Sequence, residues 1–273
     1  MLEEGSRDLG DAGIETARLD AEVLLAHACG VARGSLIAGL KVDAHVVEKF
    51  HQMIVRRAAH EPLAYILGSK EFFSLDFEVT PAVLIPRPET ETLVEAALKF
   101  LATRQQPRVL DLGTGSGAIA IAIAANAPEA RIQATDISKE ALAVARRNAI
   151  RHRCDDRIDC VAADLFPADV SNLDLIVSNP PYVAEADLAT LQPEIRLHEP
   201  HVALVFGADG LDMYRRIAAE SRSRLNADGA VMVEIGAGQA SQVAALFRRA
   251  GFSNIDAIRD LADIPRVVRA RLS

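Results

Sequence analysis

The sequence contains no tryptophan and only three cysteines, and aromatic residues make up just 4% of its 273 residues. The cysteines, Cys29, Cys154 and Cys160, are odd in number and form no CxxC pair or Cys/His cluster with the spacing of zinc ligands. This pattern excludes a disulfide scaffold and argues against a zinc site. We therefore expect three reduced thiols that pack as small apolar side chains, and no bound metal.

Long apolar runs are also missing: none approaches the roughly 18 residues that cross a bilayer. The first residues, MLEEGSRDLGD, are acidic, whereas a secretory signal begins basic and then becomes apolar. The chain carries 30 Lys and Arg against 38 Asp and Glu, a net charge of −8, which argues against an affinity dominated by nucleic-acid phosphates. We expect a cytoplasmic protein without a membrane segment and without stable nucleic-acid binding, although a local basic patch stays possible.

The amino-terminal part of the chain has a helical pattern. Leu19, Val23 and Ala26 are apolar at the spacing i, i+4, i+7, and the spacing repeats further along. The pattern ends near Pro62, because proline lacks an amide hydrogen and disfavours helix in the preceding residue. We predict a small helical bundle over residues 1–68.

The rest of the chain reads as strands and helices. Apolar and polar residues alternate over 73–79, which predicts a β-hairpin linker at 69–84. From residue 107 onward, strand-like and helix-like runs alternate, which indicates a parallel sheet covered on both faces. Two strand-like runs at the end leave no room for a crossover helix and suggest an antiparallel edge. The prediction for 85–273 is an α/β, doubly wound, mostly parallel Rossmann-like sheet with an antiparallel edge strand.

A glycine-rich loop follows the first strand of this part. The run RVLDL leads into GTGSGA, whose Gly113, Gly115 and Gly117 allow a sharp turn and bring backbone amides close to a ligand at a helix amino terminus. Asp136 ends the next strand 23 residues after Gly113, where a carboxylate can accept the hydroxyl hydrogens of a ribose. The pattern favours an adenosine-type cofactor over a plain turn and leaves nicotinamide and S-adenosylmethionine as alternatives.

A second motif follows the strand LDLIVS. In an open α/β sheet the carboxyl ends of the strands bind ligands, so Asn179, Pro180, Pro181 and Tyr182 should share an edge with the glycine loop. The side-chain oxygen of Asn179 and the backbone carbonyl of Pro180 can accept both hydrogens of a planar NH2 group, while Tyr182 offers a stacking face. Such a site would aim a nitrogen at a methyl donor and would work mainly by positioning.

These motifs together resemble a known family. DLGTGSGAIA, TDIS and VSNPPY are similar to the motifs of class I S-adenosylmethionine-dependent methyltransferases that act on planar nitrogen. EPLAYILGSKEFFSLDFEVTPAVLIPRPETE, EIRLHEPHVALVFGADGLDMYRRI and VEIGAGQ extend the match to the HemK/PrmC family, the glutamine methyltransferases of peptide-chain release factors. The resemblance covers nearly the whole chain.

The resemblance implies S-adenosylmethionine as cofactor, release factors as partners, and direct in-line methylation of the glutamine amide in their Gly-Gly-Gln motif. Asn179 and Pro180 would be the catalytic residues. Because a protein substrate needs more surface than two loops supply, we expect 1–68 to recognise it. The cofactor-binding residues would be Gly113, Thr114, Gly115, Ser116, Gly117, Asp136, Asp164 and Asn179, and the substrate-binding residues Asn179, Pro180, Pro181 and Tyr182.

One departure concerns the adenine. Some family members carry Trp directly after the aspartate that corresponds to Asp164, whereas this chain has Leu165 followed by Phe166. The side chain that stacks on the adenine is therefore open.

Other readings remain. The acceptor could be an adenine or guanine amine on nucleic acid, presented as a flipped or unpaired base, or the chain could be a non-catalytic assembly factor. Arg87, Glu89 and Glu91 could orient the cofactor or simply suit a helix start. His198 and Glu199 are neighbours without a third partner, so we assign them a structural role.

Overall fold

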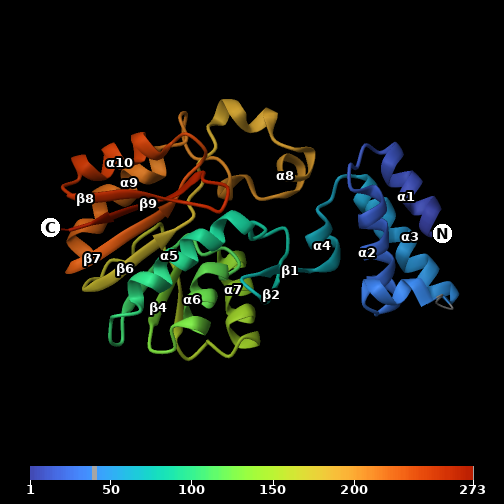
Figure 1. The fold of residues 1–273 in the computed structure, drawn as a ribbon, viewed down its shortest axis with the longest axis horizontal. Coiled ribbons are helices and arrows are strands. Elements are labelled where there is room, and N and C mark those ends of the chain that lie inside the picture. The colour runs from blue at the N-terminus through green and yellow to red at the C-terminus, as the bar shows by residue number, and fades with distance from the viewer. Residues whose placement is uncertain (39–41, 273) are drawn as a thin grey trace. The chain divides into compact units, whose positions relative to one another are not determined.

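The computed structural model describes residues 1–38 and 42–272 (Figure 1). These form two compact units by their internal contacts. The first comprises Met1–Ser69 together with Leu191–His198, and the second comprises Lys70–Thr190 and the chain from Glu199 onward. A short segment of the carboxyl-terminal half therefore belongs to the amino-terminal unit.

The first unit is a helical bundle. Its core consists mainly of Leu24, Phe50 and Ile54 with their apolar neighbours. The Asp43 side chain caps one helix by accepting a hydrogen bond from the Val46 amide at 2.9 Å. The helices are α1 (Leu2–Asp11), α2 (Ala17–Cys29), α3 (Ala44–Ala58), α4 (Leu63–Leu67) and α8 (Pro193–His198), with the 3-10 helix η1 (Arg33–Ala38).

A buried ion pair joins three of these helices. The Arg57 guanidinium on α3 donates to Asp20 on α2 at 2.7 Å and to Glu194 on α8 at 2.5 Å. Arg57 and Asp20 are each only 4% exposed, so removing one charge would leave the other buried without a partner. His198 at the end of α8 adds a 3.1 Å hydrogen bond to the Ala59 carbonyl.

A β-hairpin precedes the large sheet. Its strands are β1 (Ser69–Phe72) and β2 (Leu75–Glu78), and the turn residues Phe73 and Ser74 both have positive φ, as tight hairpin turns require. Phe72 and Phe77 pack into the core of the second unit. Asn148 exchanges two hydrogen bonds with the Glu78 backbone. The hairpin is thus fastened to the second unit.

A seven-stranded sheet forms the centre of the second unit, with the order β5-β4-β3-β6-β7-β9-β8. The first five strands in this order are parallel, and β9 runs antiparallel to both neighbours. The predicted α/β fold with an antiparallel strand near one edge is confirmed. The strands are β3 (Arg108–Leu112), β4 (Arg131–Asp136), β5 (Ile158–Ala162), β6 (Leu173–Ser178), β7 (Leu225–Glu234), β8 (Asn254–Arg259) and β9 (Pro265–Arg271).

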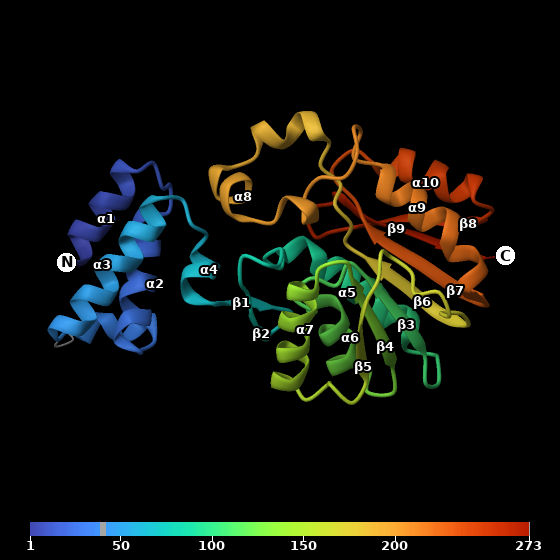
Figure 2. The ribbon, with the colours of Figure 1, turned by 180° about the vertical axis from the view of Figure 1, so that it is seen from behind.

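Helices cover both faces of the sheet (Figures 1 and 2). One face packs against α5 (Glu91–Leu101), α6 (Ala118–Asn126) and α7 (Lys139–Arg151), and the other against α9 (Asp212–Ser221) and α10 (Ala240–Arg249). The apolar sequence of α6, AIAIAIAAN, fits its nearly complete burial. The remaining 3-10 helices are η2 (Pro88–Thr90), η3 (Glu185–Thr190), η4 (His201–Ala203) and η5 (Arg222–Arg224).

Within the described ranges 1–38 and 42–272, the helices are all too short or too polar to cross a membrane.

The strand order creates a crevice beside β3. The chain proceeds from β3 through β4 to β5 on one side and then crosses to β6 on the other. Leu112 and Ser178, the last residues of β3 and β6, are register partners, so the two following loops leave the sheet at the same level. Ligands of doubly wound proteins bind at this kind of position.

Candidate active site

The glycine loop is shaped by left-handed backbone conformations. Gly113, Gly115 and Gly117 have φ of 68°, 54° and 82°, which residues with a Cβ rarely adopt. At Gly117 an added Cβ would also come within 3.0 Å of the Ile121 side chain and 3.3 Å of Ala145. Glycine there lets α6 and α7 approach each other closely.

A buried carboxyl group supports this loop from below. Asp111 on β3 is fully buried and accepts a 2.6 Å hydrogen bond from the Thr114 hydroxyl. Its other oxygen has no hydrogen-bond partner among the described residues. Burial raises the pKa of Asp111 to about 7, because the charged form loses its hydration.

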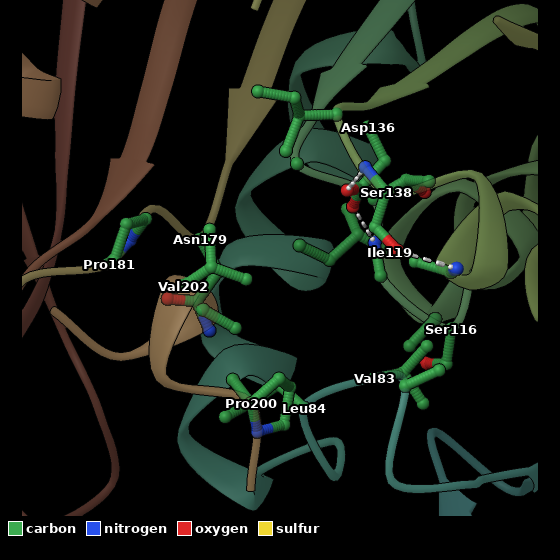
Figure 3. A pocket seen from close by; sticks show the side chains of 18 of the residues that line it. Val83, Leu84, Ser116, Ile119, Asp136, Ser138, Asn179, Pro181, Pro200 and Val202 are labelled. Atoms are coloured by element: carbon green, nitrogen blue, oxygen red, sulfur yellow. Dashed lines mark hydrogen bonds between the residues drawn. The ribbon is translucent and has the colours of Figure 1, made fainter. Parts of the chain in front are cut away.

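Asp136 fastens the loop to the end of β4. One of its oxygens accepts from the Gly115 amide and the other from the Ser138 amide, both at 2.9 Å (Figure 3). A carboxylate offers about four acceptor positions, so each oxygen retains capacity for a further donor. This arrangement fits the two hydroxyl groups of a ribose.

The loop opens into a cavity of about 1090 Å³ that includes its solvent-filled mouth. All of the lining belongs to the second unit. Figure 3 shows Asp136 and Ser138 on one side and Asn179, Pro181 and Val202 on another. The lining residues are Ala82, Val83, Leu84, Pro86, Thr90, Gly113, Thr114, Gly115, Ser116, Ala118, Ile119, Asp136, Ile137, Ser138, Ala141, Ala163, Asp164, Leu165, Asn179, Pro181, Pro200, Val202, Ala203, Phe206 and Met213.

Leu165 and Phe166, the two candidates for stacking on the adenine, have different surroundings in the loop after β5. Leu165 and Phe166 both pack into the core, but Leu165, which has a positive φ of 65°, also lines the cavity. The Phe166 ring lies under the Arg224 guanidinium. Asp164 also lines the cavity and forms a 2.9 Å ion pair with Arg216. The aromatic ring in the lining is that of Phe206, which sequence reasoning did not identify.

The NPPY residues have different surroundings. Asn179 and Pro181 line the cavity, while Pro180 is buried. Tyr182 packs against the core of the sheet, and burial raises its pKa to about 12. Its backbone carbonyl accepts a 3.1 Å hydrogen bond from the Gln239 side chain, which holds the backbone at the end of the NPPY loop.

The charged residues of the PRPETE segment make contacts within the protein. The buried Glu199 carboxyl accepts from the Ile85 amide at 3.2 Å and from the Arg87 guanidinium. Glu91 accepts from the Phe73 amide at 2.9 Å, and Glu89 lies 3.9 Å from Arg266. These contacts agree with a structural role for Glu199 and tie Arg87 to the same carboxyl.

Sequence reasoning missed two residues that surround Asn179. Thr90 accepts a 3.1 Å hydrogen bond from the Asn179 side-chain nitrogen. Glu234, at the end of β7, is 2% exposed, and its carboxyl group lies beside Thr90 and Asn179. The available signal was a glutamate inside the otherwise apolar run AVMVEI.

Over residues 1–38 and 42–272, the His, Cys, Asp and Glu side chains form no group of three or more that could hold a metal ion. The expectation of reduced cysteines agrees with three free thiols.

The fold and the paired loops define a class I methyltransferase. Two family models match: the PrmC N-terminal domain over residues 1–68 and the methyltransferase small domain over residues 90–195. The hMettl16 catalytic domain, solved with an RNA hairpin, has a similar fold, with 16% identity, a TM-score of 0.62 and coverage of 81% of this chain and 82% of that one.

Relatives at higher identity specify the family. The release factor glutamine methyltransferase of Geobacter sulfurreducens is 44% identical, covering 97% of this chain and 93% of its own length. That of Bordetella pertussis is 46% identical, covering 95% and 96%. The chain belongs to the release factor glutamine methyltransferase family.

The buried Asp111 generates a prediction about stability. A pKa raised to about 7 means that the folded state binds this proton more tightly than the unfolded chain. The stability that the folded state gains from this tighter proton binding is fully present below the ordinary pKa near 3.8 and is lost as the pH rises through 7. Asp111→Asn should therefore reduce the fall in unfolding free energy between pH 5 and pH 7, by up to about 1.4 kcal/mol per pH unit.

Urea unfolding followed by circular dichroism at several pH values measures this difference. The exposed Asp169→Asn serves as the matched control. An unchanged pH dependence in Asp111→Asn would show that Asp111 is ionised in the folded protein at pH 5.

Proposed function

We propose that the protein transfers a methyl group from S-adenosylmethionine to the side-chain amide nitrogen of the glutamine in the Gly-Gly-Gln motif of peptide-chain release factors. The observation that carries the proposal is that Asn179 and the glycine loop line one cavity at the switch point of the sheet. The relatives that match nearly the whole chain support this choice of substrate.

The residues present fit the proposed cofactor. S-adenosylmethionine, when bound, supplies a methyl group on a positively charged sulfur. Asp136 has acceptor positions for ribose hydroxyl groups beside its two backbone hydrogen bonds. Apolar residues such as Ile137, Leu165 and Phe206 line the same cavity and suit an adenine ring.

In this proposal Asn179 and Pro180 orient the glutamine side chain that receives the methyl group. The Asn179 side-chain oxygen and the Pro180 carbonyl accept the two hydrogens of the glutamine NH2 group, which directs the nitrogen lone pair toward the methyl group. An amide nitrogen is a weak nucleophile because its lone pair is delocalised. Acceptors that bind more strongly as positive charge develops on the nitrogen lower the barrier.

The helical unit is proposed to bind the release factor. Val47 and Val55 on α3 are 43% and 56% exposed, and two apolar side chains eight residues apart lie on the same face of a helix. Such a face suits a protein partner, whose interface would bury about 800 Å² on each side.

The direct test measures transfer of labelled methyl from S-adenosylmethionine to a purified release factor. The same factor with its Gly-Gly-Gln glutamine replaced, total RNA and total DNA are assayed in parallel. We expect label on the intact release factor alone. Label on RNA or DNA alone would identify a nucleic-acid amine as the acceptor, and cofactor binding without any transfer would favour a non-catalytic role.

Asn179→Ala should lower kcat by about 100-fold or more, because one of the acceptors that stabilise the developing charge is lost. Cofactor affinity, measured by calorimetry, should change by only a few fold. If cofactor affinity falls as much as kcat, Asn179 acts in cofactor binding and not in holding the amide.

Val55→Asp should raise KM for the release factor by about tenfold, since a charge is costly in the apolar centre of an interface. It should leave kcat unchanged. Leu261→Asp, at a fully exposed position of the second unit, is the matched control. A KM that is unchanged in Val55→Asp would remove this face of α3 from the interface.

A further inference from the structure

Glu234 is a buried carboxyl group beside the proposed amide site. It ends β7, a strand whose preceding residues Ala230 to Val233 are fully buried. Its Oε2 atom has no hydrogen-bond partner among the described residues. Burying a carboxyl group without full hydrogen bonding costs free energy, so this position calls for a physical explanation.

The register of the sheet brings Glu234 next to Asn179. Ser178 on β6 is the partner of Val233 on β7, so Asn179, just after β6, and Glu234, the last residue of β7, lie at the same level of adjacent parallel strands. Glu234 is absent from the described lining of the cavity, whereas Asn179 and Thr90 belong to it. Glu234 therefore lies behind the residues that meet a ligand.

Thr90 completes a chain of polar groups. Asn179 donates from Nδ2 to the Thr90 hydroxyl oxygen at 3.1 Å, and the Glu234 carboxyl group lies beside both side chains at the same level of the adjacent strand. The Thr90 hydroxyl oxygen accepts from the nitrogen side of the Asn179 amide. With Nδ2 held there, the oxygen of the same planar amide points the other way.

We propose that Glu234 is a positioning residue for methyl transfer, which fixes the Asn179 amide through Thr90 and by direct contact so that its oxygen accepts from the substrate NH2 group. This inference rests on the proposed function. The carboxylate form is the active one. Its negative charge strengthens the hydrogen bonds that link Thr90 and Asn179, and it stabilises the positive charge that develops on the glutamine nitrogen.

Protonation of Glu234 follows from its surroundings. Burial raises the pKa of Glu234 to about 7, and the nearby Glu89 raises it further while Arg266 lowers it. The phenol groups of Tyr182 and Tyr214 also face this carboxyl, and burial raises both of their pKa values. Glu234 is thus the group of this cluster that changes charge near neutral pH.

The first experiment compares the pH dependence of kcat in the full-length protein and in Glu234→Gln, with the release factor and cofactor saturating. Wild-type kcat should rise as the pH increases through about 7, since deprotonation creates the active form. Glu234→Gln should have a kcat lower by about tenfold or more and should lack this step. Asp111 also titrates near neutral pH, but it is present in both proteins, so their difference isolates Glu234.

Matched variants separate positioning from folding. Thr90→Ser keeps the hydroxyl and should retain most of the activity, whereas Thr90→Val keeps the shape and should lose it. Glu129→Gln, an exposed position, should behave as wild type. A Glu234→Gln variant with wild-type kcat and the same pH step would overturn the inference, and so would equal losses of kcat and cofactor affinity.

A second measurement does not depend on catalysis. The Asn179 side-chain NH2 resonance, assigned by its loss in Asn179→Asp, is followed by nuclear magnetic resonance from pH 5 to pH 9. It should shift with an apparent pKa near 7 in the wild type and stay constant in Glu234→Gln. A resonance that does not titrate in the wild type overturns the inference, whereas titration without methylation of the release factor leaves Glu234 in place and refutes the proposed function.

Discussion

The parallel pairing of β3 with β6 is the constraint on which the site depends. These two strands are adjacent although the chain builds β4 and β5 between them, and their last residues are register partners. The Ser178 hydroxyl also donates to the Leu112 carbonyl at 2.8 Å, which closes the pair at its carboxyl end. A slip of one residue would turn every side chain of β6 to the opposite face and would separate Asn179 from the glycine loop.

Two buried acids lie beneath the loops that this pairing brings together. Asp111 supports the glycine loop through its hydrogen bond from Thr114. Glu234 lies beside Thr90 and Asn179, which are hydrogen-bonded to each other. Burial raises both pKa values to about 7. Each carboxyl group weakens the folded state at neutral pH compared with acidic pH, and each lies beside a polar side chain that is held in one orientation.

The periodicity of the sequence predicted the elements of the sheet, because helices and strands differ in the spacing of their apolar residues. Leu165 and Phe166 show what periodicity could not predict. Both are apolar neighbours after β5 and both are buried in the core, yet Leu165, whose backbone is left-handed, also lines the cavity. Local spacing cannot distinguish them, because the difference arises from the direction in which the loop leaves the sheet.

The sequence by itself determined the class of fold, the glycine loop, Asp136 and the NPPY motif, because each depends on residue types at short spacing. Only the tertiary structure decided that Thr90 and Glu234 meet Asn179, since contacts among residues 55 or more positions apart depend on strand order and register. It also decided that α8 joins the helical unit through Glu194 and Arg57, a pair 137 positions apart. Such long-range contacts carry no local periodicity, because the packing of distant elements creates them.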